Sequence, residues 1–242
     1  MNGYETIRYE KESSIVRLTL NRPDVLNAVN LQMRDDLWDA FHAFRDDPDA
    51  RVLVLRGEGR AFSAGADIAD FGTAPSYIEA RRARRERDLW GLLLHLPKPT
   101  IAAVHGYALG AGCEMSLLCD LRVAADDARF GLPEVSLGYI PSAGGTQTLP
   151  RTIPPGVAMS MILSGDPIDA AEAYRLGLVH RVVPRADLDD AASGWAATLA
   201  GREPRVLAYA KEAIVRGLDL SLADGLALEA RLAGMVRLAA RS

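Results

Sequence analysis

The distribution of apolar and polar residues along the chain predicts strands that alternate with loops and helices. Apolar runs of strand length, bounded by turn residues, occur at 4–10, 14–20, 51–57, 99–106 and 120–126. The first two runs are close enough in sequence to pair as antiparallel strands across a turn at 10–13. Because loops and helical patterns separate the later runs, the chain is predicted to have an α/β fold.

Helical spacing of apolar residues follows two of these runs. One helix is predicted directly after Asn30, because an asparagine side chain can accept a hydrogen bond from the first turn of a helix. Its buried face would carry Leu37, Phe41 and Phe44. A longer helix is predicted over 76–96, where the following proline disfavours further helical turns.

The character of the chain changes in its last third. From about residue 150, alanine and leucine at helical spacing dominate, apart from one short strand-like run at 177–183. We therefore expect a core domain over residues 1–185, which would carry any functional site, and a helical region over residues 186–242. The predicted helices of the second region carry more apolar surface than a small domain needs. We expect this region to mediate oligomerisation.

Composition and charge exclude several classes of protein. The chain has 242 residues, of which 49% are hydrophobic and 25% are charged, and these values are ordinary for a globular protein. A net charge of −4 does not suggest a nucleic-acid partner. The arginine-rich segment at 81–88 is expected to form a solvated helix face rather than a phosphate contact.

Neither a membrane span nor a secreted disulfide framework is expected. No apolar run approaches the roughly 18 residues that a membrane helix needs, and the first residues lack the apolar centre of a signal peptide. The two cysteines, Cys113 and Cys119, form no CxxC pair. We therefore expect a reduced, cytoplasmic protein that does not bind a membrane.

Two loops share a design that suits a ligand. The sequences SAGAD (63–67) and LGAGCE (109–114) each place small residues where a predicted strand gives way to a helix. Small residues let a ligand approach the backbone, and helix N-termini offer unpaired N–H groups. If the loops converge, they would form an oxyanion hole with two donors; alternatively, the glycines only mark turns. Neither loop matches a dinucleotide fingerprint or a P-loop.

Two carboxylates stand out beside these loops. Glu114 lies in an apolar stretch, where burying an ionised group is costly unless it has a partner or a function. Glu134 follows twenty positions later, between Pro133 and Val135. Two partly buried carboxylates can hold one water molecule, with their pKa values pushed apart so that one acts as an acid and the other as a base. Glu134 could alternatively be an exposed loop residue.

Four ordered stretches resemble the crotonase family, the enoyl-CoA hydratases and isomerases. They are NRPDVLNAVN (21–30), AFSAGADI (61–68), the segment from PTIAAVHG to GGTQTLPR (99–151) and LSGDPIDAAEAYRLGLVHRVV (163–183). The resemblance implies an α/β, crotonase-like spiral of β-β-α units with a helical C-terminal trimerisation region. It also implies a homotrimer or hexamer, an acyl-CoA thioester substrate, no metal, and no cofactor beyond the coenzyme A of the substrate.

The resemblance also implies roles for individual residues. Ala66 and Ala111 would supply the two backbone N–H groups of the oxyanion hole. Glu114 would help take a proton from water, and Glu134 would deliver one to the α-carbon. The implied substrate-binding residues are Leu26, Ala28, Arg60, Ala64, Asp67, Ile68, Tyr139 and Ser142.

The chain departs from the family pattern at two of these positions. Ala111 and Ser142 stand where the family usually has glycine. Both glutamates are present, which favours an enoyl-CoA hydratase. The alternatives are another acyl-CoA reaction of the family, such as double-bond isomerisation, and a non-catalytic acyl-CoA-binding protein.

Overall fold

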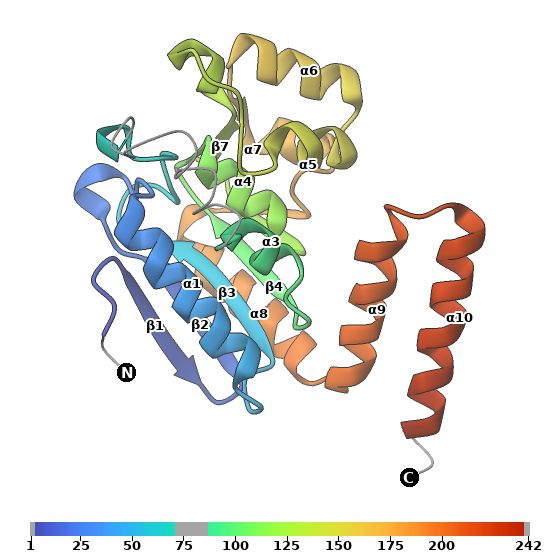
Figure 1. Cartoon of the computed structure of the whole chain (residues 1–242). Helices are drawn as coiled ribbons and strands as arrows, with labels where there is room; N and C mark the ends of the chain where they lie inside the picture. Colours follow the sequence, from blue (N-terminus) through green and yellow to red (C-terminus); the bar gives the residue numbers. More distant parts are fainter. Residues whose placement is uncertain (1–2, 71–86, 240–242) are drawn as a thin grey trace.

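The computed structural model describes residues 3–70 and 87–239, with a six-stranded sheet at its centre (Figure 1). In spatial order the strands are β1 (Ile7–Glu12), β2 (Ile15–Leu20), β3 (Val52–Gly57), β4 (Thr100–Val104), β6 (Leu121–Ala125) and β9 (Arg181–Val183). The pair β1 and β2 is antiparallel, and every later pair is parallel. All six predicted strands are confirmed, with shifted ends.

Both faces of the central strands are buried, and this explains their continuous apolar runs. In β3, Leu53 and Leu55 face one hydrophobic core, whereas Val52 and Val54 face the other. Parallel strands covered on both sides carry apolar residues at successive positions instead of at alternate ones.

Three helices cover the first face of the sheet (Figure 1). They are α1 (Leu31–Asp46), α3 (Leu89–Leu94) and α4 (Ala111–Leu118). Asn30 caps α1 as predicted, since its side-chain oxygen accepts the N–H of Met33 at 2.9 Å. The predicted apolar face of this helix is buried in the core.

Only part of the predicted helix at 76–96 can be compared with the structure. Residues 76–86, with most of the arginine-rich segment, lie outside the described residues. Of that segment, Arg87 pairs with Asp35 at 2.5 Å, and Asp88 caps the N-terminus of α3. No helix of the described chain is long and apolar enough to cross a membrane.

Helix α8 (Leu188–Ala200) covers the opposite face of the sheet. Leu188, Ala192 and Ala196 are buried there against β3, β4 and β6. This helix follows residue 185, where we placed the boundary between core and helical region. The boundary itself stays a prediction.

A second, three-stranded sheet, the 3-10 helix η3 (Pro133–Leu137) and helix α5 (Gly145–Thr152) were not expected from the sequence, whereas α6 (Pro155–Ser164) and α7 (Ala170–Arg175) lie where helical spacing was expected. The strands are β5 (Tyr107–Leu109), β7 (Arg129–Gly131) and β8 (Ile168–Asp169). Between β7 and β8 the chain forms η3, α5 and α6, and α7 follows β8. Strands of two or three residues are too short to show a period of two. The sheet matters because β5 leads directly into α4.

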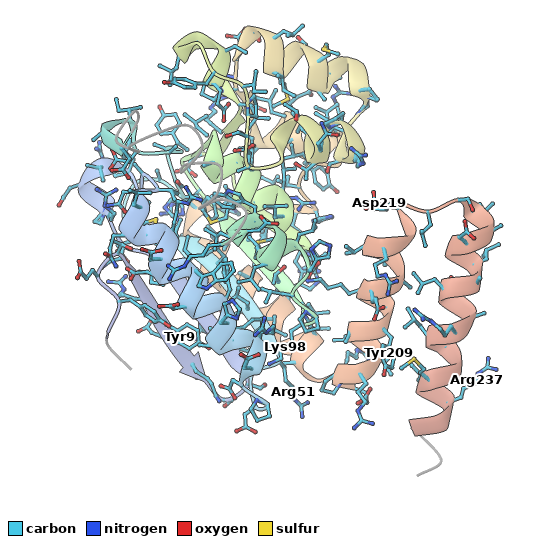
Figure 2. The ribbon with its side chains drawn as sticks, viewed as in Figure 1. Tyr9, Arg51, Lys98, Tyr209, Asp219 and Arg237 are labelled. Carbon is cyan, nitrogen blue, oxygen red and sulfur yellow. The ribbon has the colours of Figure 1, made fainter. Side chains whose placement is uncertain are left out.

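The last two helices form a hairpin that stands away from the body (Figure 1). It consists of α9 (Pro204–Gly217) and α10 (Leu222–Ala239). Figure 2 shows Arg51 and Lys98 near the foot of α9, and Asp219 at the opposite end, where the chain turns towards α10. The ammonium of Lys211 ties α9 to the body, because it lies 2.8 Å from Asp120 and donates to the carbonyl of Lys98 at 3.1 Å.

Candidate functional site

The segment 21–30 and the loop 58–67 are locked together by hydrogen bonds. The N–H of Ala64 donates to the carbonyl of Leu26 at 2.9 Å, and the hydroxyl of Ser63 donates to the carbonyl of Asn27 at 2.8 Å. The fully buried Asn27 amide donates in turn to two carbonyls of the loop. Leu26 and Asn27 have φ angles of 53° and 56°, so these bonds hold non-glycine residues in the left-handed region.

The two small-residue loops predicted as oxyanion donors lie against each other. The N–H of Ser63 donates to the carbonyl of Tyr107 at 2.9 Å, and the N–H of Leu109 donates to the carbonyl of Ser63 at 3.0 Å. Gly65 has a φ of +104°, and a Cβ built on it would lie 2.9 Å from the Leu109 oxygen and 3.6 Å from the Ala111 nitrogen. A side chain at Gly65 would therefore separate the loops.

The two predicted donors sit at the ends of these loops. Val29 pairs with the carbonyl of Gly65 and the N–H of Asp67, so the N–H of Ala66 takes no part in this bridge. Ala111 is the first residue of α4, where N–H groups lack acceptors within the helix. Convergence of the two N–H groups on one oxygen stays a prediction.

Glu114 is buried in the first turn of α4, with 2% of its surface exposed. Its Oε1 atom accepts the N–H groups of Ala143 and Gly145, both at 2.8 Å. Gly145 begins α5, so the carboxylate also lies at the positive end of that helix dipole. Burial raises the pKa of Glu114, and the two N–H donors oppose this rise.

The Glu134 carboxylate is positioned by η3 and lies over the start of α4. A Cβ built on Gly110 would lie 3.1 Å from its Oε1 atom. Its Oε2 atom is buried without a hydrogen-bond partner among the described residues. The alternative of a fully exposed loop carboxylate is therefore wrong. Burial, and secondly repulsion from Glu114, raise the pKa of Glu134 to about 7.

Several predicted substrate-binding residues belong to the locked loops. Leu26, Ala28 and Ala64 are partly buried along the contact. Asp67 pairs with Arg22 at 2.9 Å, and this partner lowers the pKa of Asp67. The same arginine donates to the carbonyl of Ala28 at 2.6 Å. Asp67 and Ala28 thus help to fasten the first loop to the second.

The remaining predicted substrate-binding residues, Arg60, Ile68, Tyr139 and Ser142, are exposed. Ile68 begins the 3-10 helix η2 (Ile68–Asp70) directly after the oxyanion loop, and Arg60 precedes that loop. Tyr139 follows η3, and its N–H donates to the carbonyl of Glu134 at 3.0 Å. Ser142 directly precedes Ala143.

Sequence reasoning missed the residues that hold the predicted ones in place. Ala143 and Gly145 bind Glu114 from about thirty positions away, as the separations of 29 and 31 residues record. Two consecutive glycines, Gly144 and Gly145 at the start of α5, were the available signal for a close backbone approach. Within residues 3–70 and 87–239, no group of three His, Cys, Asp or Glu side chains could hold a metal ion.

Known proteins of one family are similar to this chain over nearly its whole length. Residues 10–238 match the family model described as enoyl-CoA hydratase/isomerase. A Mycobacterium tuberculosis protein named "Probable enoyl-CoA hydratase echA8" is 44% identical over 95% of this chain and 88% of its own length. The crotonyl-CoA hydratase of Syntrophomonas wolfei is 39% identical over 96% of this chain and 90% of its own length.

A solved structure supports the same relationship. The enoyl-CoA hydratase subunit I from Geobacillus kaustophilus has a TM-score of 0.93 and 38% identity, and the match covers 97% of this chain and 91% of that chain. This likeness confirms the expected crotonase-like α/β fold.

Proposed function

Because this chain belongs to the enoyl-CoA hydratase/isomerase family, we propose that it is an enoyl-CoA hydratase. The enzyme would add water across the 2,3 double bond of an enoyl-CoA thioester. The observation that carries the proposal is a pair of carboxylates at the start of α4, Glu114 and Glu134, whose environments differ. The names of the relatives described above point to the same reaction.

Glu114 suits the role of base. Two N–H groups and the N-terminus of α5 favour its ionised form, and both N–H groups donate to Oε1. The other carboxylate oxygen can then accept a hydrogen bond from the substrate water. Glu114 takes a proton from this water as its oxygen bonds to C3 of the substrate.

Glu134 suits the role of acid. Its pKa, raised to about 7, keeps much of the group protonated near neutrality, and its buried Oε2 lacks another partner in the described chain. As water adds at C3, the electron pair of the double bond moves towards the thioester and C2 takes a proton from Glu134. The two transfers can occur in one concerted step.

The charge that develops on the thioester oxygen would be stabilised by the N–H groups of Ala66 and Ala111. Donors placed where negative charge grows favour the transition state over the substrate. Support for this role comes from the contact between the two loops and from the position of Ala111 at the first turn of α4. The Ala111 methyl group would narrow the space beside the thioester.

Coenzyme A would lie along the locked loops, near Leu26, Ala28 and Ala64. Arg60 is exposed there and would contact a phosphate of coenzyme A. Tyr139 and Ser142, which flank Glu134 and Ala143, would face the acyl group.

The direct test is turnover of enoyl-CoA thioesters of several chain lengths, followed as loss of the absorbance of the conjugated thioester. We expect hydration to the 3-hydroxyacyl-CoA, identified by chiral analysis of the product. A shifted double bond as the product would indicate an isomerase. Binding of acyl-CoA without turnover would indicate a non-catalytic member of the family.

We further propose that the protein assembles as a homotrimer or as a hexamer of two trimers. Of the described side chains of α10, only Leu228 and Leu232 are buried, whereas Leu218, Leu222 and Leu226 of the hairpin are exposed. A second copy would cover this apolar surface. Light scattering at micromolar concentration tests the assembly, and a monomer would refute it.

A further inference from the structure

Arg122 in β6 is a buried cation, with 6% of its surface exposed. Its Nη1 atom donates to the carbonyls of Ser116 at 3.1 Å and Cys119 at 2.7 Å, with a longer contact to Leu117 at 3.4 Å. These three carbonyls belong to the C-terminal end of α4 and the residue that caps it. The guanidinium thus binds the end of the helix opposite to Ala111.

No carboxylate within the described residues forms an ion pair with Arg122. Asp120, its neighbour in sequence, binds Lys211 at 2.8 Å instead. Burying a cation without an anionic partner is costly. The partial negative charge at the C-terminus of α4, which buried residues along the whole helix shield from water, therefore compensates Arg122 together with the attraction of Asp120.

Arg122 also joins α4 to the turn before β9. Its Nε atom donates to the carbonyl of Leu178 at 2.6 Å, and its backbone N–H donates to Nδ1 of His180 at 3.0 Å. One planar guanidinium therefore spans two segments that are far apart in sequence. A lysine ammonium has neither the fork geometry nor the length to keep both contacts.

We propose that Arg122 is a positioning residue for the proposed reaction: by holding the C-terminal turn of α4, it fixes the Ala111 N–H and the Glu114 carboxylate at the other end. The helix has eight residues and is about 12 Å long at 1.5 Å per residue. Both ends therefore move together. This proposal rests on the proposed function, because its kinetic effect is measured in the hydration reaction.

Two physical effects link Arg122 to the reaction. A displacement of about 1 Å at the reacting atoms can cost about 100-fold in rate. In addition, the negative end of a buried helix dipole repels an oxyanion at its positive end, and a cation at the C-terminus removes this repulsion. Both effects act on the transition state more than on substrate binding.

The experiment compares Arg122→Lys and Arg122→Met with the unmodified enzyme in crotonyl-CoA hydration. We expect kcat to fall about 10-fold in Arg122→Lys and about 100-fold in Arg122→Met, with KM within about twofold. The ¹³C resonance of the thioester carbonyl of bound butyryl-CoA should also move towards its value in water, because the carbonyl is less polarised.

Arg56→Lys and Arg56→Met are matched controls. Arg56 lies on β3, and its guanidinium binds Asp189 of α8 at 2.8 Å, on the other face of the sheet. These variants should lower the melting temperature without changing kcat or the carbonyl resonance.

The proposal would be overturned if a folded Arg122 variant kept the wild-type kcat, or if only KM changed. If Arg122→Met does not fold, Arg122→Lys decides the question, since it retains the charge. If the unmodified protein hydrates no enoyl-CoA, the proposed function fails. The carbonyl resonance of the saturated acyl-CoA then still tests whether Arg122 positions α4.

Discussion

The first turn of α4 and the 3-10 helix η3 each present one glutamate, but they hold it in different ways. All residues of α4 are buried, and Glu114 receives two N–H groups at the start of α5. No residue of η3 is fully buried, and the buried oxygen of Glu134 has no partner in the part of the chain described. The difference shows that burial alone does not assign an acid and a base, because the donors around each carboxylate decide which one stays ionised.

The largest effect should come from replacing each glutamate by the amide of similar shape. Glu114→Gln and Glu134→Gln should keep the fold and acyl-CoA binding but lose about 10²- to 10⁴-fold in hydration rate, because each removes a proton transfer. The double variant should be less impaired than the product of the single losses, since in the proposed mechanism the two groups act on one water.

Exchange of the α-proton on a saturated acyl-CoA would sharpen the division of roles. This reaction needs an acid or base at the α-carbon but no added water. Glu134→Gln should abolish it, whereas Glu114→Gln should reduce it less. Hydration by Glu134→Gln at the wild-type rate would contradict the mechanism.

The donors of Glu114 can be disturbed without altering any carboxylate. A Cβ at Gly145 would lie 2.9 Å from the Oε1 atom of Glu114, so Gly145→Ala should displace the carboxylate. We expect kcat to fall about 10- to 100-fold in steady-state hydration assays. Gly156→Ala is the matched control, because a Cβ there would have no neighbour within 4 Å. Equal activity of the two variants would show that the position of Glu114 is not critical.

The pH dependence of the rate should report both carboxylates. The proposed mechanism needs a protonated Glu134, whose pKa is raised to about 7, so kcat/KM should fall above pH 7 by up to about 10-fold per pH unit. It should also fall in acid, where Glu114 becomes protonated. In Glu134→Gln, the residual rate should lack the alkaline decline. If kcat/KM of this variant still fell at alkaline pH, the fall would come from the titration of a group other than Glu134.

The smallest expected effect concerns stability. In the folded protein the pKa of Glu134, about 7, lies above the ordinary value of 4.5 that applies to the unfolded chain. The contribution of Glu134 to the free energy of unfolding is therefore complete below pH 4.5 and is lost as pH rises through 7. The difference in unfolding free energy between Glu134→Gln and wild type should therefore shift in favour of the variant by on the order of 1 kcal/mol from pH 5 to pH 8, after allowance for solvent screening.

Urea unfolding at the two pH values measures this difference. Glu10→Gln, a change at an exposed position on β1, is the control. A constant difference between wild type and Glu134→Gln across the range would mean that Glu134 is not destabilised by its surroundings.

Patterns within short stretches of sequence predicted one helix cap, one buried helix face and the two small-residue loops. The cap at Asn30 and the apolar face of α1 follow from helix rules, and the loops at 63–67 and 109–114 follow from small residues at strand ends. Glu114 stood out because a carboxylate in an apolar stretch needs a partner.

The partners themselves could not be predicted in the same way. The pairing of Arg22 with Asp67 and the contact of Arg122 with Leu178 join segments 45 and 56 residues apart. Such contacts depend on the tertiary arrangement, which no period along the chain records. The very short strand β8 and the packing of α8 on the sheet were missed for the same reason.

The separation between Glu114 and its donors has a consequence for folding. Loop closure over a long stretch of chain costs entropy before the contact is made, so non-local contacts form slowly. During synthesis, α4 is made before Ala143 and Gly145, so the Glu114 carboxylate stays in water or is buried without these donors until residues 143–145 are free to pack against it. The central strands up to β6 can already pair at that stage. The candidate site is therefore completed after much of the sheet that carries it, and a chain released before residue 143 would lack both N–H donors of Glu114.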